Sequence, residues 1–99
     1  MAEILVLDDV LDAVILIQKI LTRQGHNVTT FTEEEEAISH AAKNPVDLAI
    51  LDIKLKKMSG IQVLEAMKKS SPDLKVIMLT GYPTIETARE AIELGAGEY

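Results

Sequence analysis

The chain has 99 residues, of which 47% are hydrophobic and 3% aromatic, and it carries a formal net charge of −6. This length allows one small domain with an aliphatic core. The acidic balance argues against direct nucleic-acid binding, and the lack of cysteine excludes disulfides and thiolate metal sites. No signal peptide or bilayer-length apolar stretch is visible, so we expect a cytoplasmic protein with no membrane contact.

Strand-like and helix-like patterns alternate from the N-terminus. The apolar run of residues 4–7 predicts a buried strand over about residues 3–7, and residues 11–24 predict a helix. Asp9 is the candidate N-cap of this helix, and Gly25 follows its C-terminal end. A strand followed by a helix at the very start of the chain indicates an α/β architecture.

A second strand and a second helix follow. Residues 27–31 alternate between polar and apolar side chains, which predicts a shorter, more exposed strand. The residues of 32–35, Thr-Glu-Glu-Glu, predict a capping box that opens a helix. That helix should end at Asn44 because Pro45 disfavours helical backbone in the residue before it.

The remaining segments repeat this alternation. Residues 47–51 and 75–79 predict two more buried strands. Between them, residues 59–62 predict another capping box, with a helix continuing to Ser70. A fourth helix is expected over residues 84–94. Because right-handed crossovers place helices on both faces of a parallel sheet, we expect a doubly wound α/β fold.

Three apolar runs end at polar residues. The runs are residues 4–7, 48–51 and 76–79. Asp8 and Asp9 follow the first run, Asp52 the second, and Thr80 and Gly81 the third. Parallel strands would bring these polar groups to one edge of the sheet, where ligands bind in such folds. Crowded carboxylates repel one another, and a hard cation such as Mg²⁺ relieves that repulsion.

These residues, in this order and at these separations, resemble the receiver domain of bacterial response regulators, especially receivers of the NtrC-like kind. The resemblance covers the whole chain. It rests on Asp8-Asp9, Asp52, Gly60, Thr80-Gly81 and the segments 80–88 and 94–99. It implies a flavodoxin-like sheet with strand order 2-1-3-4-5 and a phosphoryl-transfer chemistry.

The resemblance also implies roles at the acidic edge. Asp52 would accept a phosphoryl group from a histidine kinase or a phosphotransfer protein. Asp9 and Asp52 would hold Mg²⁺ with the backbone carbonyl of Lys54, and Asp8 would help through water. A carboxylate suits this role because it is already ionised at neutral pH and needs no base to act as a nucleophile.

The resemblance assigns a switch to the residues after the fourth strand. Thr80, next to Gly81, would hydrogen-bond a phosphoryl oxygen, and Tyr99 would turn inward when Thr80 moves. Such a movement would couple the chemistry to the surface of the fourth helix.

One expected residue is missing from the pattern. The family carries a lysine on its fifth strand that pairs with the phosphoryl group, and by motif it would fall three residues after Tyr99. We therefore expect residues 1–99 to be a single receiver-like domain whose fifth βα unit is largely missing. The fourth strand would then be an exposed edge open to pairing with another chain.

The first helix is apolar around nearly its full circumference, which predicts burial on more than one side. We expect a patch of Leu11, Val14 and Ile15 to contact a partner, most plausibly a second copy of the chain. The alternative is that these residues contact a fifth helix in a longer protein. If the partner is a second copy, the homodimer would form through this helix or through the exposed sheet edge.

Three functional hypotheses follow. The first is a phosphoacceptor signalling domain that catalyses its own phosphorylation and hydrolysis but transforms no external metabolite. The second is a pseudo-receiver that serves as a dimerisation or docking module and does not respond to phosphate. The third, a Mg²⁺-dependent phosphatase with an aspartyl nucleophile, is disfavoured because Lys54 stands where such enzymes carry a second acid.

Overall fold

A computed structural model describes residues 2–52, 55 and 59–79 of the chain. Strands and helices alternate within these residues, as the apolar patterns predict. The elements are β1 (Glu3–Leu7), α1 (Leu11–Arg23), β2 (Asn27–Phe31), α2 (Glu34–Lys43), β3 (Leu48–Asp52), α3 (Gly60–Ser70) and β4 (Lys75–Leu79). The fourth helix expected over residues 84–94 lies outside the described residues.

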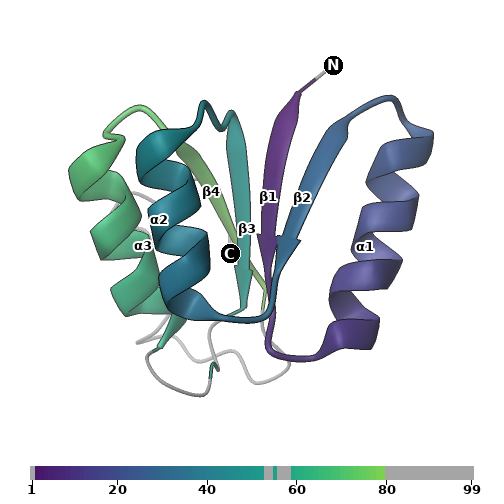
Figure 1. The fold of residues 1–99 in the computed structure, drawn as a ribbon, viewed down its shortest axis with the longest axis horizontal. Helices are drawn as coiled ribbons and strands as arrows, with labels where there is room; N and C mark the ends of the chain where they lie inside the picture. Colours follow the sequence, from purple (N-terminus) through teal and green to yellow (C-terminus); the bar gives the residue numbers. More distant parts are fainter. Residues whose placement is uncertain (1, 53–54, 56–58, 80–99) are drawn as a thin grey trace.

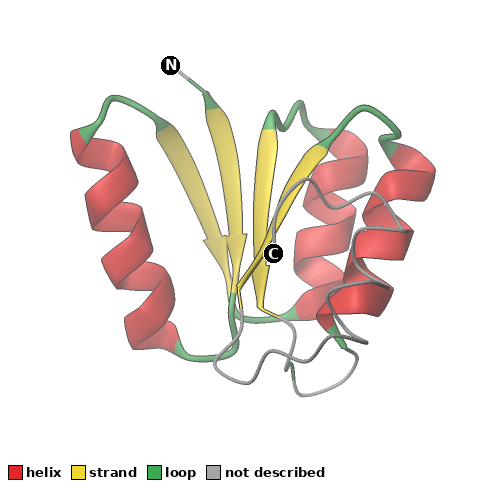
Figure 2. Ribbon diagram, turned by 180° about the vertical axis from the view of Figure 1, so that it is seen from behind, coloured by secondary structure: helices red, strands yellow, loops and turns green. Residues whose placement is uncertain are grey.

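The four strands form one parallel sheet with the order β2-β1-β3-β4. Figures 1 and 2 show α1 on one face of this sheet and α2 and α3 together on the other. The doubly wound α/β fold is therefore confirmed, as is the strand order 2-1-3-4. The place of a fifth strand in that order lies outside the described residues.

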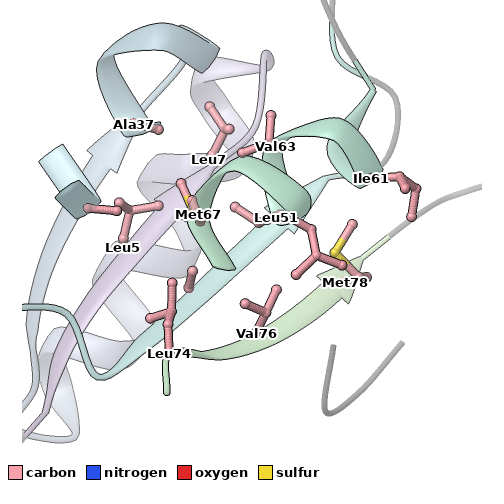
Figure 3. Close-up of a cluster of buried hydrophobic side chains, with 13 residues drawn as sticks. Leu5, Leu7, Ala37, Leu51, Ile61, Val63, Met67, Leu74, Val76 and Met78 are labelled. Atoms are coloured by element: carbon pink, nitrogen blue, oxygen red, sulfur yellow. The ribbon is translucent and has the colours of Figure 1, made fainter. Parts of the chain in front are cut away.

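Buried apolar side chains fill both faces of the sheet, because successive residues of a strand point to opposite sides. In β1, Leu5 and Leu7 belong to the cluster beneath α2 and α3 (Figure 3), whereas Ile4 and Val6 belong to the cluster beneath α1. This explains why the strand is an unbroken apolar run with no polar alternation.

Two of the predicted helix ends are confirmed. Ser59 is the N-cap of α3: its Oγ accepts a hydrogen bond from the backbone N–H of Gln62 (3.2 Å), and the Gln62 Oε1 accepts one from the Ser59 N–H (3.0 Å). At the end of α1, Gly25 adopts φ +91°, the left-handed conformation that glycine tolerates without steric cost. The N–H of Gly25 donates to the carbonyl of Thr22, which ends the helix.

The Ser59 cap supplies a stability test. Ser59→Ala is expected to lower the free energy of unfolding by about 1 kcal/mol, because it leaves the Gln62 N–H without its side-chain acceptor. Ser39→Ala is a matched control, since Ser39 is an exposed residue in the middle of α2. Urea denaturation of both variants measures the difference, and equal losses would contradict a stabilising role for this cap.

Two other predicted caps are wrong by one residue. The N-cap of α1 is Val10, with an extended backbone, and not Asp9. The N-cap of α2 is Glu33, also extended, so Thr32 lies before the helix and its capping box does not form. Each helix begins one residue later than its capping motif requires, which places the expected cap residue outside the first turn.

Candidate functional site

Three aspartates lie at the carboxyl edge of the sheet. Asp8 and Asp9 directly follow β1, and Asp52 is the last residue of β3. Because β1 and β3 are hydrogen-bonded neighbours, with Leu7 in register with Leu51, the three residues emerge side by side. The sheet topology therefore brings together acids that are more than forty positions apart in the sequence.

The three carboxylates converge. One oxygen from each of Asp8, Asp9 and Asp52 lies within 4.8 Å of the other two, and all three residues are partly buried. The geometric expectation drawn from the sequence, that these acids meet at one point, is confirmed. Within residues 2–52, 55 and 59–79, they are the one group of three metal-ligating side chains this close together.

Asp8 is held in place through both its backbone and its side chain. Its N–H donates to the carbonyl of Phe31 at the end of β2 (3.2 Å), and its Oδ1 accepts from the N–H of Val10 (2.9 Å). The second bond is a local Asx-type turn that connects β1 to α1. One carboxylate oxygen of Asp8 therefore accepts the hydrogen bond of this turn, which fixes the side chain at the edge of the sheet.

The crowding of acids changes the ionisation of Asp8. Burial is the largest cause and raises the pKa of its carboxyl above the usual value; the neighbouring charges of Asp52 and Asp9 raise it further. The hydrogen bond from the Val10 N–H acts in the opposite direction, because it favours the charged form. A site that disfavours its own negative charge gains most from a cation.

The donor set fits a hard divalent cation. Carboxylate oxygens are the ligands that Mg²⁺ and Ca²⁺ prefer. Two oxygens bound to one Mg²⁺ are at most about 4.2 Å apart, twice the usual bond length. The 4.8 Å limit in this site is slightly wider, so small side-chain rotations bring the three acids within reach of one ion.

The other sequence-predicted site residues are not described. Lys54, Thr80, Gly81 and Tyr99 all lie outside the described residues, so their roles stay predictions.

The predicted patch on the first helix needs a correction. Val14 is 1% exposed and packs with Ile4, Val6 and Ile50 beneath α1, so it is a core residue and not part of an exposed patch. Leu11 and Ile15 are exposed on α1.

None of the helices in the described residues is long and apolar enough to span a membrane.

A hollow of about 530 Å³ lies at the opposite edge of the sheet, and no pattern in the sequence predicts it. The loops before β3 and β4 form it, and its lining includes Asp47, Asp73 and Lys75. Asp47 uses its Oδ2 to accept a hydrogen bond from the Glu3 N–H (2.8 Å). This hollow belongs to the amino ends of the strands, away from the three converging carboxylates.

Comparison with known proteins places the chain in a family. The family model of the response regulator receiver domain matches residues 4–99. A curated relative, the transcriptional regulatory protein ZraR of Escherichia coli K12, is 32% identical over 97 residues, which cover 98% of this chain and 22% of ZraR. The chain thus spans about a fifth of the length of this relative.

Solved structures agree with this family. A CheY-like receiver domain protein from Methanospirillum hungatei has a TM-score of 0.96 and 31% identity, covering all of this chain and 79% of that one. A Burkholderia pseudomallei response regulator, determined with a phosphorylated aspartic acid, a calcium ion and citrate, has a TM-score of 0.94 and 28% identity, covering all of this chain and 58% of that one. The chain belongs to the response regulator receiver domain family.

Proposed function

We propose that this chain is the phosphoacceptor domain of a two-component system and acts in the cytoplasm. Asp52 takes a phosphoryl group from a histidine kinase or a phosphotransfer protein, with Mg²⁺ held by the carboxylates of Asp8, Asp9 and Asp52. One observation carries the proposal: Asp8, Asp9 and Asp52 converge to within 4.8 Å at the carboxyl edge of the sheet. The phosphorylated aspartic acid and calcium ion of the Burkholderia pseudomallei regulator support the same chemistry.

The transfer step needs a nucleophile, a leaving group and charge neutralisation. A carboxylate oxygen of Asp52 attacks the phosphorus of a phosphohistidine, a P–O bond forms and the P–N bond breaks. The electron pair of the broken bond stays on the imidazole nitrogen, which takes a proton from water. Bound Mg²⁺ would offset the repulsion between Asp52 and the phosphoryl oxygens.

The protein's own contribution is mainly positional. The Asx-type turn at Val10 fixes Asp8, and the β1–β3 ladder fixes the spacing between Asp9 and Asp52. A pre-set arrangement of acids avoids reorganisation when the ion and the phosphoryl group arrive. The domain catalyses its own phosphorylation and hydrolysis, and it transforms no external metabolite.

The remaining parts of the proposal involve residues that the family pattern assigns. The backbone carbonyl of Lys54 completes the metal site. Thr80, beside Gly81, follows the phosphoryl oxygens through a hydrogen bond, and Tyr99 turns inward in response. The phosphorylated carboxylate carries roughly two negative charges and three acceptor oxygens by analogy with other phosphorylated side chains, enough to reposition a hydroxyl nearby.

The proposal is tested by direct phosphorylation. The chain is incubated with acetyl phosphate and Mg²⁺, and its intact mass is measured. We expect a gain of one phosphoryl group that is absent without the metal and absent in Asp52→Asn. Asp73→Asn is the matched control, since Asp73 is an exposed acid at the opposite edge. A folded protein that gains no mass would contradict the proposal and favour a docking module that does not respond to phosphate.

A further inference from the structure

The outer face of α1 has a self-complementary pattern. Asp12, Ile15, Leu16 and Lys19 are all exposed, with Ile15 at 37% and Leu16 at 60%. Their spacing of three, four and seven residues places them on one face of the helix. Two apolar side chains therefore occupy the middle of this face, with an acid toward its N-terminal end and a base toward its C-terminal end.

This face points away from the sheet. The opposite side of α1 packs Val14, Ile17 and Leu21 against the sheet, and Figure 1 shows α1 alone on its side, far from α2 and α3. Neither Asp12 nor Lys19 forms an ion pair with another of the described residues. Within the part of the chain that the structure describes, no element covers the outer face.

We propose that this face binds a second copy of the chain, with the two α1 helices antiparallel about a twofold axis that passes between Ile15 and Leu16. In that arrangement Ile15 and Leu16 meet the same residues of the partner subunit. Asp12 faces Lys19 of the partner subunit, and the symmetry repeats this pair on the other side. A parallel arrangement would oppose like charges, so the charge order selects the antiparallel one.

A hollow on the same helix supports this arrangement. It has a volume of about 400 Å³ and is lined by Gln18, Lys19, Thr22 and Arg23, which lie on two successive turns. The twofold axis brings Leu11 of the partner subunit to the level of these turns, on the same side of the contact. Leu11 is 60% exposed, so it has the character of a knob that fills a hole between four side chains.

The contact is small. One helix from each copy buries less than the roughly 1,200 Å² of a standard stable interface, so we expect a reversible, concentration-dependent dimer. Because the helices are antiparallel, the two acidic sites lie at opposite ends of the pair. Self-association therefore leaves Asp52 accessible, and it can be measured independently of phosphorylation.

Charge reversal tests the geometry by sedimentation equilibrium. Asp12→Lys and Lys19→Glu are each expected to weaken self-association by about tenfold, because each creates two like-charge contacts. An equimolar mixture of the two variants is expected to recover a dimer at least as tight as the wild type, since every contact between unlike variants is then attractive. A parallel pairing also predicts a tight mixed dimer, but it predicts no weakening in either single variant, because like charges would already face each other in the wild type.

Two further variants complete the test. Leu16→Glu is expected to abolish self-association, whereas Glu36→Lys, an exposed charge reversal on α2, is expected to leave it unchanged. Circular dichroism checks that each variant is folded. If Leu16→Glu is not folded, Ile15→Gln takes its place. The proposal is overturned if the wild type stays monomeric at millimolar concentration, or if the mixed variants associate no better than either alone.

Discussion

Replacing Leu5 with alanine is expected to lower the free energy of unfolding by about 2–5 kcal/mol. Leu5 is completely buried in the middle of β1, where it belongs to the apolar cluster between the sheet and the helices α2 and α3 (Figure 3). The loss combines the transfer free energy of the removed side-chain carbons with the cost of the cavity that they leave behind. Such a loss is a large fraction of the stability of a domain this size.

Leu79→Ala provides the matched control, because it makes the same change on a strand where the side chain is 45% exposed. Its expected loss is less than half as large, and urea denaturation of both variants measures the difference. A Leu5→Ala loss below about 1 kcal/mol would show that the cluster can close around the missing atoms. Because Asp8 and Asp9 directly follow β1, a destabilised β1 should disturb the acidic site as well.

Most of the fold could be predicted because its signals are strong and local. The run of residues 4–7 predicts a strand buried on both faces, which is typical of a parallel sheet covered by helices on both sides. The convergence of Asp8, Asp9 and Asp52 followed from the same reasoning, since neighbouring parallel strands end at one edge. Neither inference required the position of any single side chain.

The predicted details that were wrong depend on which of two neighbouring residues takes a given position. Asp8 and Asp9 are both able to serve a turn or a helix cap, and the chain uses Asp8 in a turn with Val10 instead of using Asp9 as a cap. In α1, apolar residues surround the helix, so periodicity could not show that Val14 faces the core and Ile15 the solvent. Only the contact of α1 with the sheet decides between these faces.

The acidic site makes a second prediction with a large effect. In metal-free buffer at neutral pH, Asp8→Asn is expected to be more stable than the wild type. The pKa of Asp8 is raised in the folded state above its usual value of 3.8, mainly by burial and then by the charges of Asp52 and Asp9. Ionising Asp8 therefore costs stability, and asparagine, which keeps an oxygen to accept the Val10 N–H, avoids that cost.

The stability difference between Asp8→Asn and the wild type should depend on pH, and the direction of the Asp8 pKa shift fixes its sign. Because the folded protein holds this proton more tightly than the unfolded chain, the cost is absent at pH values below 3.8 and develops as the pH rises from there through the folded pKa. The advantage of Asp8→Asn should thus vanish in acid. Thermal unfolding followed from pH 3 to 7 in the presence of a chelator measures it.

Magnesium is expected to reverse the order of the two proteins. An ion that binds only the folded state adds about 2.7 kcal/mol when its free concentration is 100 times its dissociation constant. The wild type should gain this stability, and Asp8→Asn should gain less because the site has lost one negative charge. An equal gain in both proteins would remove Asp8 from the metal site, and no gain in either would mean that the three converging carboxylates do not hold Mg²⁺.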